Sequence, residues 1–237
     1  MTVLSNPVQV YRRAMKDALG FPSIMLLASM TGFGSLAKES GLTLGMALSS
    51  TAGIWGLPGQ VALAEMHAAG VSALFVILAV SLANARFLPM AVSFIPLMRD
   101  GVKRFGWMFA LVQLLSINSW AAGLRNFPDI AVNLRARYYV LFALICMSAG
   151  LIGTGIGYFG VGVMNRPAAL GLIFLNPLFF AVLLAGSQAR PAIVAMLIGI
   201  PLGPILHMLS PDWGLLVTGL LGGTLAYYLH RNVLEQR

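Results

Sequence analysis

Long apolar runs, separated by short charged or turn-forming clusters, constrain the fold of this chain more than any other feature. Only 9% of its 237 residues are charged, whereas a soluble domain carries about 25% charged residues. A helix of about 20 apolar residues crosses the hydrocarbon core of a bilayer. The runs lie near Phe21–Ala37, Leu44–Ala69, Val71–Met98, Gly106–Leu124, Tyr138–Met164, Ala168–Ser187, Ala192–Leu209 and Trp213–Leu229. They predict an all-α polytopic membrane helix bundle of about seven to eight transmembrane segments.

The number of crossings stays open between seven and eight, because the first run is short and the second is interrupted by proline and glycine. No internal repeat, low-complexity stretch or domain boundary is visible. We therefore expect residues 1–237 to form a single integral-membrane domain. Residues 1–20, with Arg12, Arg13 and Lys16, resemble a signal peptide, but no small-residue cleavage site follows before Lys38. We expect them to form a cytoplasmic amphipathic amino-terminal segment.

The net charge of +8 would suggest nucleic-acid binding in a soluble protein. Here the basic residues lie mostly between apolar runs, where they act as topology anchors beside anionic lipid. With eight crossings and a cytoplasmic start, nine Lys and Arg side chains face the cytoplasm and five face outside. The expected partner of this charge is therefore the lipid bilayer, with no nucleic acid.

The second run contains Gly53-Ile54-Trp55-Gly56-Leu57-Pro58-Gly59-Gln60, which predicts a discontinuous helix. Pro58 has no N–H for the carbonyl of Ile54, and its ring clashes with the preceding turn. Backbone groups freed in a membrane need protein or water as partners, so a break implies a cavity. A half-helix beginning near Gly59 would present its free N–H groups there. A simple proline kink, with the glycines serving close helix packing, remains the alternative.

Arg86 lies near the middle of the third run, beside Asn84 and three residues before Pro89. A guanidinium at this depth costs about 3 kcal/mol and needs water, a partner or an anion. Pro89 frees the carbonyl of Ala85 next to it. Asn84 and Ser81 share a helix face, whereas Asn84 and Arg86 do so only if the helix is broken. The alternative is that Arg86 snorkels or pairs with carbonyls while Asn84 only joins helices.

Other polar residues fall inside the apolar runs and jointly suggest a polar interior. They are Gln113, Ser116, Asn118, Ser119 and Asn176, and Pro201, Gly203 and Pro204 interrupt the seventh run. The three histidines have no metal-ligand spacing, and no nucleophile elbow or phosphate-binding glycine loop is present. The single Cys146 offers no disulfide framework. The sequence therefore predicts neither an enzyme nor a cofactor.

The chain resembles the AzlC family, the large subunit of branched-chain amino acid exporters. Three motifs carry the resemblance: Ser49 through Gln60, ending in Gly-Gln; Asn84-Ala85-Arg86-Phe87-Leu88; and Leu175-Asn176-Pro177-Leu178-Phe179. The opening Phe33-Gly34-Ser35-Leu36-Ala37 and the turn Ala68-Ala69-Gly70 are also similar to the family's. The resemblance implies an ion-gradient-driven exporter in the bacterial inner membrane, multi-pass, working with a small AzlD-type membrane subunit.

The fourth run departs from the family pattern. Members of the family usually carry Thr-Asp-Glu there, and the corresponding stretch is Ile117-Asn118-Ser119-Trp120. The acidic pair is absent, so the substrate or its coupling to an ion differs if that pair holds an ammonium or a proton. Arg86 is accordingly interpreted as an anion receptor rather than as half of an ion pair.

The leading hypothesis is a secondary transporter that exports small carboxylate-bearing solutes, most of all branched-chain or other apolar amino acids. Arg86 and the half-helix near Gly59 would hold the carboxylate, and Trp55, Phe87 and Trp120 would form apolar walls. A non-transporting scaffold subunit and a channel-like permease are the alternatives. The predicted substrate-binding residues are Gly56, Pro58, Gly59, Gln60, Asn84, Arg86, Asn118 and Asn176.

Overall fold

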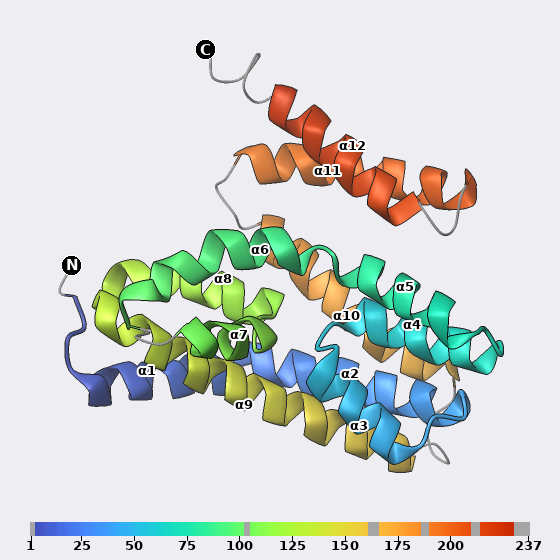
Figure 1. Ribbon diagram of the computed structural model, residues 1–237, viewed down its shortest axis with the longest axis horizontal. Helices are drawn as coiled ribbons and strands as arrows, with labels where there is room; N and C mark the ends of the chain where they lie inside the picture. The colour runs from blue at the N-terminus through green and yellow to red at the C-terminus, as the bar shows by residue number, and fades with distance from the viewer. Residues whose placement is uncertain (1–2, 102–104, 161–165, 186–189, 210–213, 230–237) are drawn as a thin grey trace. The chain divides into compact units, whose positions relative to one another are not determined.

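The computed structural model describes residues 3–101, 105–160, 166–185, 190–209 and 214–229, and these residues form an all-helical protein (Figure 1). The described part holds twelve α-helices and two 3-10 helices. In chain order they are α1(Pro7–Leu19), α2(Phe21–Glu39), α3(Leu44–Gly53), α4(Leu57–Ala68), α5(Ala73–Asn84), α6(Phe87–Phe94), η1(Ile95–Gly101), α7(Phe105–Gln113), α8(Ile117–Asn126), η2(Phe127–Asp129), α9(Val132–Phe159), α10(Arg166–Ala185), α11(Arg190–Leu209) and α12(Gly214–Leu229). The predicted all-α class is confirmed.

The helices correspond to the apolar runs of the sequence, either singly or in pairs. Among the described residues, α9 alone is long and apolar enough to cross a membrane as one straight helix. Three bent pairs reach the same length and composition: α1 with α2, α5 with α6 and η1, and α7 with α8 and η2. Up to four spans are therefore present by length and composition, and the total of seven to eight crossings stays a prediction.

The chain divides into two compact units, residues 1–176 and 177–237. In the second unit, α11 packs against α12. Helix α11 continues through Pro201 and Pro204, so the interruption expected in the seventh run is wrong. The first unit contains α1–α9, the start of α10 and every residue of the candidate site described below.

Helix α1 is amphipathic, as expected for the amino-terminal segment. Asn6 caps its first turn by accepting a hydrogen bond from the N–H of Val8 at 2.9 Å. Val10, Ala14 and Ala18 recur at a spacing of four residues and are fully buried, while Arg12 and Lys16 are exposed. A bend of 42° separates α1 from α2. This arrangement is typical of a helix at a membrane interface.

Helices α2 and α9 lie side by side and pack along much of their length (Figure 1). Small residues allow the close approach: a Cβ at Gly157 would overlap the carbonyl of Thr31, and a Cβ at Gly153 would overlap that of Leu27. These two glycines form a Gly-x-x-x-Gly pattern, which lets membrane helices pack backbone to backbone. A glycine of α2 has the same role toward α9: a Cβ at Gly34 would overlap the carbonyl of Thr154.

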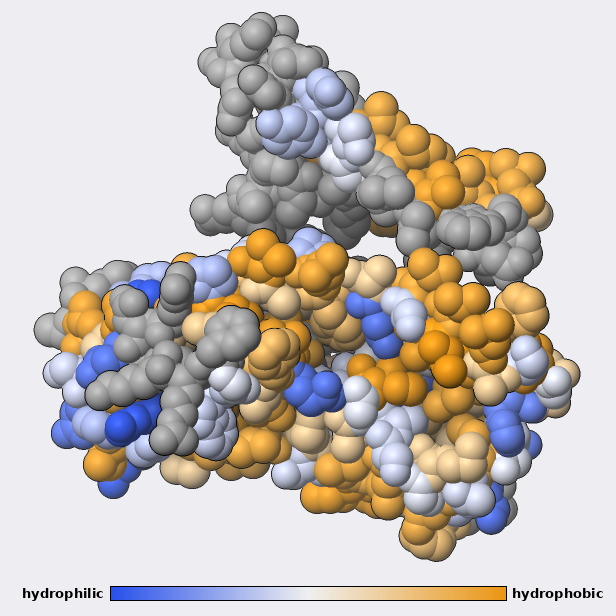
Figure 2. Space-filling view, in the orientation of Figure 1, coloured by the Kyte–Doolittle hydropathy of each residue, from blue (hydrophilic) through white to orange (hydrophobic). Residues whose placement is uncertain are grey.

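Figure 2 shows a broad apolar area over α5. Hydrophilic residues lie at the end where α1 and α8 lie, and smaller groups of them lie elsewhere on this face of the first unit. Large exposed hydrophobic side chains include Leu74, Phe75 and Ile77 of α5. Their exposure fits contact with lipid rather than water.

The α2–α9 contact generates a prediction about stability. Gly157→Ala should lower the thermal stability of the detergent-solubilised protein, because overpacking a tight contact costs about 1–3 kcal/mol. Gly155→Ala is the matched control on the same helix, since a Cβ there meets no atom within 4 Å. Fluorescence-detected size-exclusion chromatography after heating measures both variants. Equal melting temperatures for the two would show that close packing at Gly157 is unimportant.

Candidate substrate site

The first element of the site is the break between α3 and α4. Helix α3 ends at Gly53 and α4 begins at Leu57, so Ile54, Trp55 and Gly56 interrupt the run. Trp55 has a φ of 48°, an uncommon left-handed conformation for a bulky side chain. Pro58 lies in the first turn of α4, where its missing N–H leaves no intrahelical bond unmade. The predicted discontinuous helix is confirmed, and the simple proline kink is excluded.

A second break, which the sequence analysis did not predict, separates α7 from α8. The two half-helices meet at 110°, so the run Gly106–Leu124 does not form one straight segment. The break contains neither proline nor glycine. Its signal was Ser116 followed three residues later by Ser119: each side chain hydrogen-bonds the backbone N–H of the other residue. This reciprocal capping starts a new helix inside an apolar run.

The third interruption is a bend of 44° between α5 and α6, at Ala85 and Arg86. The carbonyl of Ala85, expected to be free because of Pro89, accepts a hydrogen bond from the N–H of Leu88 at 3.1 Å. This tighter turn replaces the bond that Pro89 cannot make. The Ala85 carbonyl therefore already has one partner inside the protein.

A cavity of about 360 Å³ lies where these interruptions meet. Its lining comes from the α3–α4 break, from the last turns of α5, from Phe87 and from the α7–α8 break. The lining residues are Gly53, Ile54, Trp55, Val80, Ser81, Asn84, Phe87, Val112, Gln113 and Leu115. Its lining combines apolar side chains with the polar groups of Ser81, Asn84 and Gln113, and its size is that of a site for a small organic molecule.

Asn84 is the polar residue most closely joined to the broken helix. A Cβ at Gly59 would come within 2.6 Å of Asn84 Nδ2, and a Cβ at Gly56 would overlap Asn84 Oδ1. The carboxamide therefore lies directly against the first turn of α4, and only glycine leaves room for it. Asn84 Oδ1 is buried and has no hydrogen-bond partner among the described residues. Asn84 lines the cavity, and its Oδ1 is an unused acceptor that is itself covered, against Gly56.

The amino terminus of α4 supplies groups of the opposite polarity. No side chain caps it in the part of the chain that the structure describes, and Gly56 occupies the N-cap position. The first N–H groups of a helix have no intrahelical partner and carry partial positive charge. A buried acceptor thus lies against the first turn of α4, whose leading N–H groups have no intrahelical partner.

Gln113 holds the other side of the α3–α4 break. Its Nε2 group donates to the carbonyls of Ala52 at 2.9 Å and Gly53 at 2.8 Å. These carbonyls belong to the last turn of α3, where helix carbonyls lack intrahelical donors. One side chain from the end of α7 therefore satisfies the carboxyl end of α3. In the sequence, Gln113 is one of several polar residues inside the apolar runs, and its spacing gives no sign of these partners.

Arg86 lies beside the cavity and is not among its lining residues, although its neighbours Asn84 and Phe87 are. Its guanidinium carbon is 5.4 Å from the centroid of the Phe87 ring, a cation–π contact. Within the described residues, no hydrogen bond or ion pair to the guanidinium is found. The side chain is exposed in the first unit.

The other predicted residues take different positions. Gln60 faces the helix packing and donates to Thr51 Oγ1 at 3.0 Å, and Thr51 shares a hydrogen bond of 2.9 Å with Thr154 of α9. Pro58 is exposed, and Asn118 is buried in the first turn of α8 with no partner for Oδ1 among the described residues. The side chain of Asn176 lies outside the described residues.

Two of the three expected aromatic walls line the cavity. Trp55 is 4% exposed, and its indole Nε1 has no acceptor within the described part of the chain. Phe87 forms a second wall. Trp120 instead packs against the buried core of the first unit.

The arrangement defines a class of protein: an all-helical, multi-pass membrane protein in which interrupted helices surround a small cavity. Comparison with protein families gives the particular family, because AzlC protein matches residues 23–164. The match covers more than half of the chain, so the chain belongs to the AzlC family, a family of branched-chain amino acid transporter subunits rather than enzymes. Comparison with curated proteins and with solved structures finds no match.

The matched region contains the cavity and all three helix interruptions that surround it. The second unit, residues 177–237, lies beyond the match. The resemblance noted from the motifs is thus confirmed at the level of the family.

The role of Gln113 generates a prediction. Gln113→Leu should lower the melting temperature of the purified protein, because two carbonyls at the end of α3 lose their donor and a net hydrogen bond contributes about 0.5–1.5 kcal/mol. Gln113→Glu should be destabilising as well, since a carboxylate cannot donate to a carbonyl. Unchanged melting of both variants would mean that water or lipid satisfies these carbonyls.

Proposed function

We propose that this protein is the large subunit of a secondary transporter that exports small carboxylate-bearing solutes, most of all branched-chain or other apolar amino acids. The proposal places it in the bacterial inner membrane, with a small AzlD-type membrane subunit as its partner. Family membership supports the transport class. The observation that carries the substrate class is Asn84, whose buried, unpartnered oxygen lies against the uncapped first turn of α4.

An amino acid has three parts, and the cavity together with the adjoining first turn of α4, which is not part of its lining, offers a complement to each. The carboxylate is suited to the free N–H groups of α4, because helix amino termini bind anions. The ammonium group is suited to Asn84 Oδ1, an acceptor without another donor in the described structure. The aliphatic side chain is suited to the apolar wall made by Ile54, Val80 and Leu115.

Arg86 is proposed to assist binding of the substrate carboxylate. It follows Asn84 at the α5–α6 bend, and its guanidinium lies over the ring of Phe87, which lines the cavity. We propose that it attracts the carboxylate toward the cavity and binds it during part of the transport cycle. A guanidinium at membrane depth is costly, and an anionic substrate offsets that cost.

Transport should depend on the fit between Asn84 and α4. Gly59→Ala should abolish most leucine counterflow in liposomes, because its Cβ would displace the Asn84 carboxamide. Gly45→Ala is the matched control, since a Cβ there meets its nearest atom at 4.0 Å. Both variants should reach normal levels in the membrane. Wild-type counterflow in Gly59→Ala would contradict a substrate site at Asn84.

Arg86→Lys should severely impair transport at normal membrane levels, because a point charge does not reproduce bidentate binding of a carboxylate. Reconstitution should include any small membrane protein that copurifies, and a panel of amino acids identifies the substrate. Neutral substitutions of Asn84 and Arg86 should leave the protein folded but inactive. Loss of folding in these variants, with no transport by the wild type, would instead favour a scaffold subunit.

A further inference from the structure

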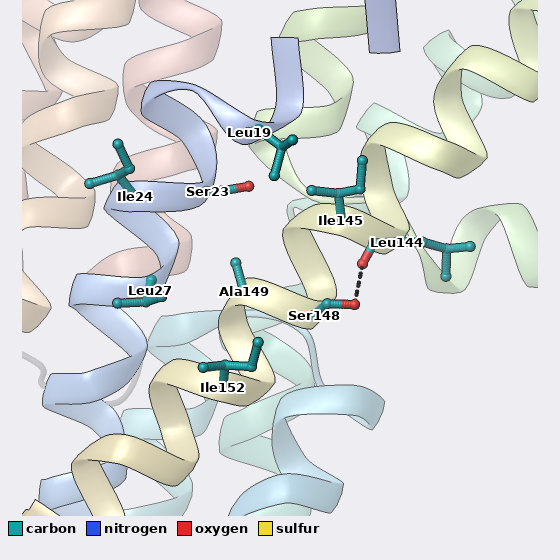
Figure 3. Close-up of a pocket in the computed structure, with 9 residues that line it drawn as sticks. All are labelled: Leu19, Ser23, Ile24, Leu27, Leu144, Ile145, Ser148, Ala149 and Ile152. Carbon is teal, nitrogen blue, oxygen red and sulfur yellow. Dashed lines mark hydrogen bonds between the residues drawn. The ribbon is translucent and has the colours of Figure 1, made fainter. Parts of the chain in front are cut away.

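A second cavity, of about 400 Å³, lies on the outside of the α2–α9 pair, away from the substrate site (Figure 3). It is an open, apolar groove between the two helices, and one end lies at the α1–α2 bend. Figure 3 shows α2 on one side and α9 on the other, with Leu19 at the end nearest α1. The lining residues are Leu19, Ser23, Ile24, Leu27, Leu144, Ile145, Ser148, Ala149 and Ile152.

Small residues make the groove, and their polar atoms are already used. Ser148 Oγ donates to the carbonyl of Leu144 at 2.9 Å, and Ser23 Oγ lies 3.9 Å from Cys146 Sγ in a weak hydrogen bond. The groove therefore offers a ligand only apolar surface. In a membrane protein, a groove of this kind takes a hydrocarbon chain.

Basic side chains surround the end of the groove that lies at α1. Lys16 precedes Leu19 by one helical turn, and Arg12 precedes Lys16 by another, with all three side chains exposed. On α9, exposed Arg137 lies seven residues before Leu144 and so shares its helix face. The groove thus runs from a cationic end at the amphipathic helix α1 toward the middle of α9.

The acidic residue at this end is neutralised by partners within the protein. Asp17 accepts hydrogen bonds from Arg13 Nε at 3.1 Å and from the Tyr138 hydroxyl at 2.9 Å. Arg13 also donates to Asn126 at 2.9 Å. In the part of the chain that the structure describes, no ion pair engages Lys16, Arg12 or Arg137.

We propose that the groove binds an anionic phospholipid: one acyl chain lies between α2 and α9, and the phosphate lies against Lys16 and Arg137. The ligand is a lipid rather than a partner helix, because the groove combines an apolar length with positive charge at one end only. This arrangement is complementary to an anionic phospholipid, which has apolar chains and one negatively charged headgroup. The site is independent of which solute the protein transports.

Native mass spectrometry of the delipidated full chain tests this site. Phosphatidylglycerol and phosphatidylcholine with identical acyl chains are titrated separately. The first phosphatidylglycerol should bind roughly 25-fold more tightly, since each of the two basic residues near an anionic headgroup contributes on the order of a fivefold effect. Equal affinity for the two lipids would overturn the proposal.

Headgroup variants locate the charge. The double variant Lys16→Gln and Arg137→Gln should remove the preference for phosphatidylglycerol, whereas Lys38→Gln, at the other end of α2, should keep it. All three residues are exposed, so folding should not be affected. A preference that survives in the double variant would overturn the assignment of the phosphate to these residues.

Groove variants locate the acyl chain. Ala149→Leu should weaken binding of both lipids several-fold by filling the groove, and Ala73→Leu, on an exposed position of α5, should not. Ser148→Val is a second groove variant whose exposed side chain does not endanger folding. Unchanged lipid binding in both groove variants would contradict the site. Displacement of both lipids alike by a copurifying small membrane protein would contradict it too and assign the groove to a partner helix.

Discussion

The structure depends on one constraint: inside a bilayer, the backbone polar groups of a broken helix need partners from the protein, from water or from a ligand. At the α3–α4 break, the backbone groups on one side have partners within the described part of the protein and those on the other side do not. Its carboxyl side is satisfied, because Gln113 donates to the carbonyls of Ala52 and Gly53. Its amino side is left open, with an uncapped helix start and a buried Asn84 oxygen that lacks a donor among the described residues. The unsatisfied side is where we expect a zwitterionic substrate to bind.

The frame that supports this break is assembled from close helix contacts. Gly153 and Gly157 let α9 approach α2, and Thr154 between them joins Thr51 of α3, which in turn accepts from Gln60 of α4. Both half-helices of the break are therefore attached to the same long helix. The Nε2 group of Gln60, a residue predicted to bind substrate, thus joins α4 to α3. A transport cycle that moves α4 would have to exchange these hydrogen bonds.

Sequence patterns were sufficient for the helices and for the break at Pro58, because apolar runs and proline act locally. They did not predict the break between α7 and α8, since Ser116 and Ser119 are ordinary residues for helix packing and their capping depends on geometry. They located Asn84 at the site and missed Gln113, whose partners lie about 60 residues earlier in the chain. The sequence did not show that Arg86 lies outside the cavity lining, because its position depends on the bend between α5 and α6, which residue spacing alone does not determine.

The central claim is that an apolar amino acid binds in the cavity beside the α3–α4 break, and a cysteine-protection measurement tests it most directly. The chain has a single cysteine, Cys146, which is buried. In a Cys146→Ala background, Val80→Cys places a thiol in the cavity wall, and Ser148→Cys places one in the outer groove. The account predicts that leucine slows labelling by a methanethiosulfonate reagent at position 80 and leaves labelling at position 148 unchanged. Equal labelling rates at position 80 with and without each amino acid of the panel would contradict it.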